Sequence, residues 1–150
     1  MGKRSDFERV PRDCYDTPAA AVHPLLMHLP KRFRFVEPAG GRGALVDSLV
    51  AAGGACAGAS DIEPRRQDIE RRDAMTLTAA DIPRNALIIT NPPHARAVLH
   101  PMIALFALLA PTWLLLPADW KENAGSAELV GHLQVYQPIG RLAWMPGTTA

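Results

Sequence analysis

The sequence predicts an α/β fold in which a mostly parallel β-sheet is flanked by helices. Short apolar runs suited to buried strands occur at residues 33–36, 86–90 and 112–116. Stretches in which apolar residues follow helical spacing occur at residues 44–52 and 95–109. Strands that alternate with helices pair in parallel and bury both faces, so this order favours one sheet covered on both sides.

Weaker signals predict the remaining elements. Thr17-Pro18 resembles a helix N-cap followed by a first-turn proline, and it precedes an expected helix over 19–29 that Pro30 ends. Residues 1–13 are polar and are expected to form a flexible arm. The other expected elements are a strand of small residues at 55–60, a charged surface helix at 65–72, a loop or short helix at 124–131, and strands at 133–136 and 139–144.

Composition and charge narrow the class of protein. The 150 residues fit one domain, 1–150, and a hydrophobic content of 48% can supply its core. The formal net charge is +1, from 16 basic and 15 acidic residues, which excludes coating of nucleic acid through a general excess of positive charge. Any contact with nucleic acid is therefore expected to be local or to be supplied by a partner.

Cysteine usage and the apolar runs indicate a cytoplasmic protein with no membrane anchor. Cys14 and Cys56 lie far apart and form neither a metal-binding spacing nor a disulfide framework, so we expect two reduced thiols and no metal site. Residues 1–10 lack an apolar signal core. The longest apolar stretch, 102–116, is interrupted by Pro111 and is too short to span a bilayer comfortably.

A glycine-rich loop follows the first predicted strand. It reads Glu-Pro-Ala-Gly-Gly-Arg-Gly at residues 37–43 and leads into a predicted helix. In an open parallel sheet, ligands bind beyond the carboxyl ends of the strands, and glycines let the backbone turn sharply and approach a ligand closely. The loop lacks the Gly-Lys-Ser/Thr ending of a P-loop. It is either a ligand-binding loop or a tight turn that binds nothing.

Acidic residues follow the next two predicted strands. Asp61 lies about twenty residues after the glycine loop, a spacing at which a carboxylate accepts hydrogen bonds from ribose hydroxyls. Ile62 beside it can pack against an adenine ring. Asp73 can accept a hydrogen bond from the adenine amino group or simply cap a turn. These features fit a nicotinamide dinucleotide or S-adenosylmethionine, and each acid alone is also typical of an ordinary loop.

The tetrapeptide Asn91-Pro92-Pro93-His94 ends the strand at 86–90 with a stiff turn. The prolines fix their φ angles and remove two donors, which leaves carbonyl groups free to accept. Asn91 Oδ1 and the Pro92 carbonyl can then accept from one amino group. Two acceptors localise the lone pair of an aromatic amino nitrogen, which can attack a sulfonium methyl without a metal. His94 can stack on the target ring. The alternative is a turn with no chemistry.

Together these motifs resemble the class I S-adenosylmethionine-dependent methyltransferases, and within them the phage and prophage DNA adenine-N6 methyltransferases. The resemblance rests on residues 15–18, 35–43, 61–64, 73–74, 91–94 and 139–147. It implies a Rossmann-like fold with a shortened C-terminal strand region. It implies a catalytic role for Asn91, Pro92, Pro93 and His94. The cofactor-binding residues that it implies are Tyr15, Thr17, Pro18, Glu37, Pro38, Ala39, Gly40, Gly41, Gly43, Asp61, Ile62, Asp73, Ala74 and Asn91.

The resemblance implies methyl transfer from S-adenosylmethionine to adenine N6 in DNA, with the base flipped out of the duplex. Two departures accompany it: His94 replaces the family's usual Tyr, Phe or Trp, and the chain ends at Ala150 without the family's final strand. Target recognition is therefore expected to need a protein partner or a homo-oligomer. The alternatives are the same chemistry on RNA or on a protein glutamine, a non-catalytic cofactor-binding module, and a nicotinamide-dependent oxidoreductase.

Overall fold

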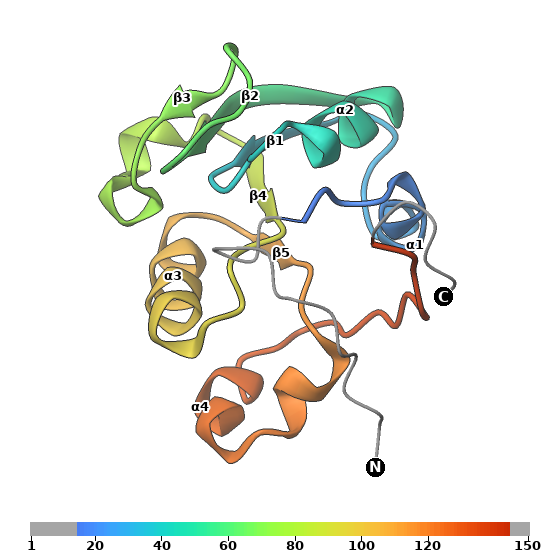
Figure 1. The fold of residues 1–150 in the computed structure, drawn as a ribbon, viewed down its shortest axis with the longest axis vertical. Helices are drawn as coiled ribbons and strands as arrows, with labels where there is room; N and C mark the ends of the chain where they lie inside the picture. Colours follow the sequence, from blue (N-terminus) through green and yellow to red (C-terminus); the bar gives the residue numbers. More distant parts are fainter. Residues whose placement is uncertain (1–14, 145–150) are drawn as a thin grey trace.

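Five parallel strands form one sheet in the computed structural model, which describes residues 15–144 (Figure 1). The strand order is β3-β2-β1-β4-β5, so the chain reverses its direction of winding between β1 and β4. An open parallel sheet of this order is compatible with a Rossmann-like fold, and its ligand site is expected at that reversal. The strands are β1 Phe33–Glu37, β2 Gly54–Asp61, β3 Glu70–Arg71, β4 Ala86–Thr90 and β5 Thr112–Leu114.

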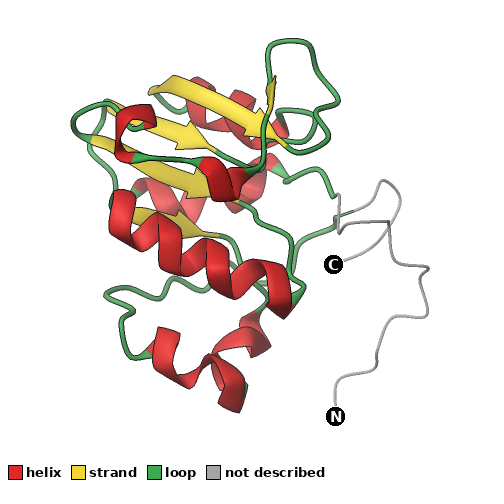
Figure 2. Cartoon of the chain, turned by 90° about the vertical axis from the view of Figure 1, so that its left-hand side faces the viewer, coloured by secondary structure: helices red, strands yellow, loops and turns green. Residues whose placement is uncertain are grey.

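Helices cover both faces of the sheet, as the sequence predicts. The longest, α3, lies across one face, and α1 and α2 lie on the other (Figures 1 and 2). The α-helices are α1 His23–Leu26, α2 Ala44–Ala51, α3 Arg96–Leu109 and α4 Ala127–Val130. The 3₁₀ turns are η2 Ala19–Ala21, η3 Ala74–Thr76, η4 Ala79–Asp81, η5 Ala118–Glu122 and η6 Ala124–Ser126.

Two hydrophobic cores lie on opposite faces of the sheet because successive strand residues point to opposite sides. Ile89 of β4 packs in one core with Phe35 and Leu49, under α2. Its neighbour Ile88 packs in the other core with Phe106 of α3. This double burial explains the unbroken apolar run of β4, which the sequence predicts at its observed bounds.

The helix predicted over 19–29 forms only in part. The chain forms only η2 and the single turn α1, with Pro24 inside that turn. Proline has no N–H to donate and its ring crowds the carbonyl four residues earlier, so Pro24 favours a break between η2 and α1, although α3 runs through Pro101. Thr17 is not an N-cap either, because Pro18 holds that position and no side chain caps η2.

The predicted surface helix at 65–72 is wrong. This segment forms a loop and the short strand β3, which pairs with the end of β2 through Ser60 and Asp61. Its arginines bind carboxylates from other segments: Arg66 contacts Asp47, and Arg72 contacts Asp81. These contacts between distant residues stabilise an extended chain in place of the helix that local charge spacing favours.

The two strands predicted at 133–136 and 139–144 do not form. Residues 132–144 are irregular and run from α4 back towards α1 (Figure 1). His28 Nε2 and Gln137 Oε1 are 2.9 Å apart and join this segment to the chain after α1. Pro138 supplies no N–H for a strand ladder. Within residues 15–144 the sheet therefore ends at β5.

Two expected features cannot be compared with the structure. The arm expected at residues 1–13 and the end of the segment 139–147 lie outside residues 15–144. Within residues 15–144, the helices are too short or too polar to cross a bilayer.

Candidate functional site

A cavity of about 380 Å³ lies at the carboxyl ends of β1, β2 and β4, where the direction of winding reverses. We call it the first cavity. Most of the predicted cofactor-binding and catalytic residues line it, although they come from five separate segments. Those residues are Tyr15, Thr17, Glu37, Pro38, Ala39, Gly40, Gly41, Asp61, Ile62, Asp73, Ala74, Asn91 and Pro93.

Four predicted site residues do not line the first cavity. Pro18, Gly43 and Pro92 line neither this cavity nor the second one described below, and the Pro92 side chain is buried. His94 lines the second cavity instead. The sequence therefore predicts the segments that form the site. It does not predict which cavity each residue of the proline turn lines.

Asp61 fixes the shape of the glycine loop. Its Oδ2 accepts a hydrogen bond of 2.8 Å from the Gly41 N–H, and its Oδ1 accepts one of 2.7 Å from the Glu63 N–H. Gly41 has a φ of 52°, in the left-handed region that glycine adopts most easily. Each carboxylate oxygen has a second lone pair, so Asp61 retains acceptor capacity towards the cavity.

Gly43 lines neither cavity, and its role is structural. It has a φ of 81° and immediately precedes α2. A Cβ here would collide with the guanidinium of Arg66. Arg66 occupies that space because it donates to Asp47 at 2.8 and 2.9 Å and to Asp68 at 2.6 and 3.0 Å.

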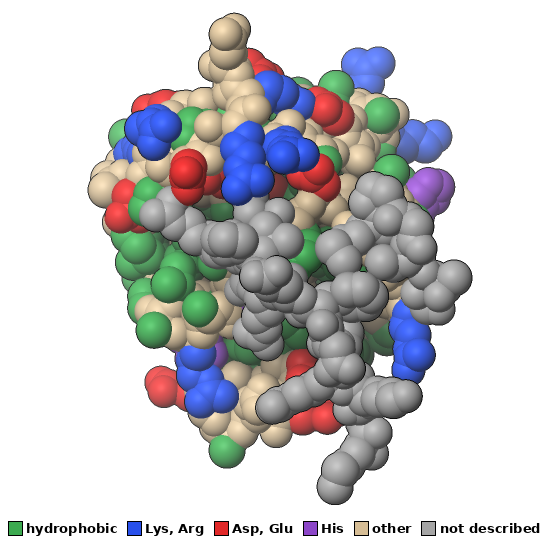
Figure 3. Space-filling model, viewed as in Figure 1, with side chains coloured by type: hydrophobic (Ala, Val, Ile, Leu, Met, Phe, Trp, Pro, Cys, Tyr) green, Lys and Arg blue, Asp and Glu red, His purple; other side chains and the backbone are tan. Residues whose placement is uncertain are grey.

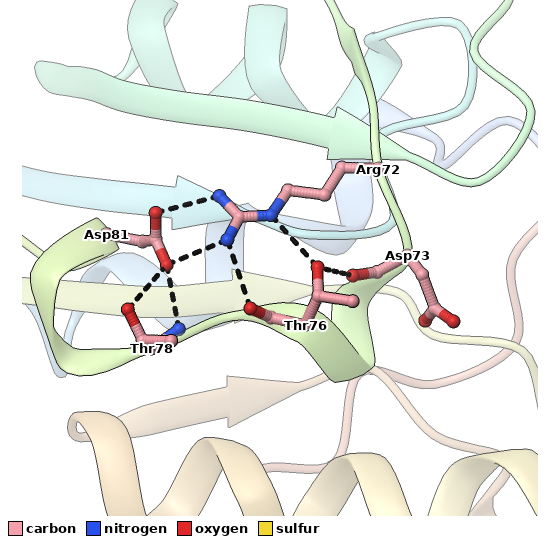
Figure 4. Close-up of polar contacts among 5 residues, drawn as sticks. All are labelled: Arg72, Asp73, Thr76, Thr78 and Asp81. Atoms are coloured by element: carbon pink, nitrogen blue, oxygen red, sulfur yellow. Dashed lines mark hydrogen bonds and ion pairs between the residues drawn. The ribbon is translucent and has the colours of Figure 1, made fainter.

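A network around Arg72 positions the segment that carries Asp73 (Figure 4). The guanidinium donates to both oxygens of Asp81, at 2.7 and 2.9 Å, and to the Thr76 carbonyl at 3.0 Å. The backbone N–H and hydroxyl of Thr78 also donate to Asp81. Hydrogen bonding to Arg72 holds the pKa of Asp81 well below its usual range. The turn is thus stabilised from outside the cavity.

Asp73 both caps a turn and lines the first cavity. Its Oδ1 accepts from the Met75 N–H at 2.9 Å, which caps η3. In Figure 4 its side chain points away from the Arg72 network. Its Oδ2 makes no hydrogen bond with the described residues, so one oxygen is available to a ligand.

Glu37 is a fully buried carboxyl group that lines the first cavity. Oε1 accepts from the Ala39 N–H at 3.0 Å, while Oε2 has no hydrogen-bond partner among the described residues. Burial raises the pKa of Glu37 to about 8, with a smaller contribution from the charge of Asp61 and against the opposing effects of the Thr90 hydroxyl and the Ala39 amide. The group is therefore largely protonated at neutral pH.

The proline turn places the Asn91 amide at the wall of the first cavity. Asn91 Nδ2 donates to Thr17 Oγ1 at 3.2 Å, so the segment before η2 is bonded directly to the turn. Asn91 Oδ1 is buried and has no partner in the part of the chain that the structure describes. A buried acceptor without a donor is costly, and it is the type of atom that a ligand N–H can satisfy.

A second cavity, of about 640 Å³, lies on the other side of the proline turn. It shares Thr17 and Leu45 with the first cavity. Its walls come from α1, the ends of β4 and β5, the η5 turn and the irregular segment 133–144. Sequence reasoning missed it because its walls combine distant segments. The one available signal is the clustering of tryptophan and leucine after residue 112.

The first cavity has an acidic lining. Five carboxyl groups contribute to it, against the two arginines Arg42 and Arg65. Arg42 and Asp16 form an exposed ion pair of 3.7 Å, in which their charges offset each other. The five are Asp16, Glu37, Asp61, Glu63 and Asp73. The face of the molecule shown in Figure 3 carries basic and acidic side chains next to one another.

Comparison with protein-family models, with curated proteins and with solved structures finds no match for this chain. The fold and the site define its class: an α/β protein with an all-parallel sheet and a cavity at the strand ends. Within the described residues no group of three or more His, Cys, Asp or Glu side chains is placed to hold a metal ion.

Proposed function

We propose that this protein is an S-adenosylmethionine-dependent methyltransferase that acts on an exocyclic amino group, adenine N6 in DNA. The observation that carries the proposal is the position of Asn91 Oδ1. This buried, unpartnered acceptor lies at the wall of an acidic cavity and next to a second cavity. In this proposal the first cavity binds the methyl donor and the second binds the methyl acceptor. Asn91 Oδ1, which accepts hydrogen bonds, lies between them.

The charge of the first cavity favours S-adenosylmethionine over a nicotinamide dinucleotide. S-adenosylmethionine carries a sulfonium and an ammonium group against one carboxylate, so it is a net cation that an acidic lining attracts. A dinucleotide would bring two phosphates towards four other carboxyl groups beside the largely protonated Glu37, with only Arg42 and Arg65 to balance them. The volume of about 380 Å³ lies in the usual range of small-molecule sites.

Different lining residues contact different parts of the S-adenosylmethionine molecule. Asp61 accepts from the ribose hydroxyls with the lone pairs that the loop leaves free. Asp73 accepts from the adenine amino group through Oδ2, and Ile62 and Ala74 contact the adenine ring. Glu37 faces the ammonium group, which favours its ionised form.

Asn91 activates the acceptor nitrogen. The bound donor supplies an electrophilic methyl group on sulfur. Asn91 Oδ1 accepts one hydrogen of the incoming amino group and so localises the nitrogen lone pair for in-line attack. The nitrogen–carbon bond forms as the carbon–sulfur bond breaks, and the extra proton on nitrogen is lost to solvent. Positioning of the two reactants accounts for most of the rate.

The second cavity holds the ring that carries the amino group. Its wall includes His94, to which we assign contact with the planar ring, and it adjoins Asn91 through the proline turn. A base in a duplex reaches such a cavity only when it is flipped out of the stack.

Transfer of a labelled methyl group tests the proposal. The protein is incubated with labelled S-adenosylmethionine and, separately, DNA, RNA and a mixture of denatured proteins. We expect label in DNA and a loss of at least a hundredfold for Asn91→Ala. Asn123→Ala is the matched control, because this exposed residue lines neither cavity. Equal incorporation by the wild type and Asn91→Ala would remove Asn91 from the mechanism. Label in RNA or protein instead of DNA would replace the proposed substrate, and no label in any polymer would favour a binding module.

A further inference from the structure

The two cavities differ sharply in charge. The first has five carboxyl groups in its lining. Among the described residues that line the second cavity there is no Asp or Glu, and its only Lys and Arg side chains are Lys121 and Arg141. Two adjoining cavities with opposite charge, which share Thr17 and Leu45, select opposite ligands: a cation in one and an anion in the other.

The second cavity is also the aromatic one. All three tryptophans of the chain, Trp113, Trp120 and Trp144, line it, together with Tyr136 and His94. Flat aromatic side chains stack on the π-face of any nucleobase. A lining of rings and aliphatic side chains with two cations fits a molecule that is planar in one part and anionic in another.

The two cations lie at the edge of this aromatic lining. Lys121 belongs to η5, and its Nζ is 5.0 Å from the centre of the Tyr136 ring. Its side chain is 33% exposed, and its ion pair with Glu122 is long, at 3.4 Å. Arg141 is exposed on segment 133–144 and forms no ion pair with other described residues. Both groups can therefore take a new anionic partner at little cost in broken contacts.

We propose that the second cavity binds one unstacked nucleotide of a nucleic-acid strand, with the base among the aromatic side chains and the flanking phosphates on Lys121 and Arg141. This inference rests on the proposed function and deepens it, because it assigns the phosphate-binding residues of the acceptor site. Charge then keeps each ligand in its own cavity: phosphates are repelled from the acidic first cavity, and the cationic donor is repelled from the second. A protein glutamine offers no phosphate and uses neither cation.

Salt dependence gives the inference a quantitative form. Each phosphate contact on a single strand contributes about −0.7 to the slope of log affinity against log salt concentration. Two contacts predict a slope of about −1.4. Because the chain is otherwise close to neutral, with a net charge of +1, little further slope is expected from the rest of the surface.

Binding of a fluorescently labelled single-stranded hexanucleotide that contains adenine tests the inference in the absence of any methyl donor. Fluorescence anisotropy is measured over a range of sodium chloride concentrations for the wild type and for Lys121→Gln/Arg141→Gln. We expect at least tenfold weaker binding at low salt for the double variant, and loss of most of the slope. Arg84→Gln is the matched control, because Arg84 is exposed and lines neither cavity. The charge-conserving pair Lys121→Arg/Arg141→Lys is expected to keep most of the affinity and the slope.

The outcomes separate this inference from the proposed function. Equal affinity and slope in the wild type and the folded double variant would overturn the phosphate assignment, even if methyl transfer to DNA occurs. Binding of a glutamine-containing peptide but not the hexanucleotide would overturn it as well. A wild type that binds the strand with the expected slope, yet transfers no methyl group, would leave the inference standing and remove the proposed chemistry. Thermal melting of each variant shows whether it is folded.

Discussion

Replacement of Glu37 by glutamine is expected to change how stability depends on pH. The carboxyl group is fully buried, and burial raises its pKa from 4.5 to about 8. The folded protein therefore binds this proton more tightly than the unfolded chain does. Glutamine has the shape of the protonated acid and keeps an oxygen that accepts from the Ala39 N–H, so Glu37→Gln imitates the neutral form at every pH.

The sign and size of the effect follow from proton linkage. A raised pKa in the folded state contributes stability that is fully present below about pH 4.5 and is lost as the pH rises through 8. One pKa unit corresponds to about 1.4 kcal/mol, so the wild type loses about 3 kcal/mol relative to Glu37→Gln between pH 5 and pH 8. The lowered pKa values of Asp68 and Asp81 do not enter this difference, because both proteins share them.

Urea unfolding at pH 5, 6, 7 and 8, without ligand, measures the free energy of unfolding of both proteins. The wild-type value minus the Glu37→Gln value should fall by about 1 kcal/mol for each pH unit. Glu128→Gln is the control, since this exposed carboxyl group lies on α4 and belongs to neither core. A difference that stays constant from pH 5 to pH 8 would show that Glu37 is charged throughout, and the account of its burial would be wrong.

Two further predictions concern a glycine and a hydroxyl group. Gly43→Ala should lower the free energy of unfolding by about 1–2 kcal/mol, because it combines a φ of 81° with a collision with Arg66. Gly58→Ala, which meets no atom within 4 Å and has no positive φ, should change it by less than about 0.5 kcal/mol in the same urea titration; equal losses would refute the argument. Thr17→Val should lower kcat for methyl transfer about tenfold, because it removes the acceptor that holds Asn91, while Thr17→Ser restores it. An unchanged kcat for Thr17→Val would show that the turn holds Asn91 in place without Thr17.

Local patterns predict the central strands β1 and β4 because these strands are largely buried. The run at 86–90 is apolar for that reason, and its bounds agree with β4. The helices at 44–52 and 95–109 are also predicted to within one residue, since each presents an apolar face to one core. Periodicity and burial are properties of neighbouring residues, so a single sequence contains them.

Contacts between distant residues account for what the sequence does not predict. The charged segment at 65–72 has the composition of a surface helix, but Arg66 and Arg72 bind Asp47 and Asp81, which no local pattern connects to them. The expected strands at 133–136 and 139–144 have suitable residues, but strand formation also requires pairing in register with a sheet edge, and these residues do not pair with β5. The second cavity depends on where that segment lies, so it was unpredictable as well.

The three acidic residues that the sequence predicts for the donor site differ in what they can still offer a ligand. Both oxygens of Asp61 already accept backbone N–H groups, so its first role is to hold the loop in shape. Asp73 has one oxygen free of its turn, and Glu37 has one that is buried without a partner. A neutral ligand would leave Glu37 protonated, whereas a cationic one stabilises its charged form. The buried carboxyl group is thus the feature of the cavity that responds most directly to the charge of whatever occupies it.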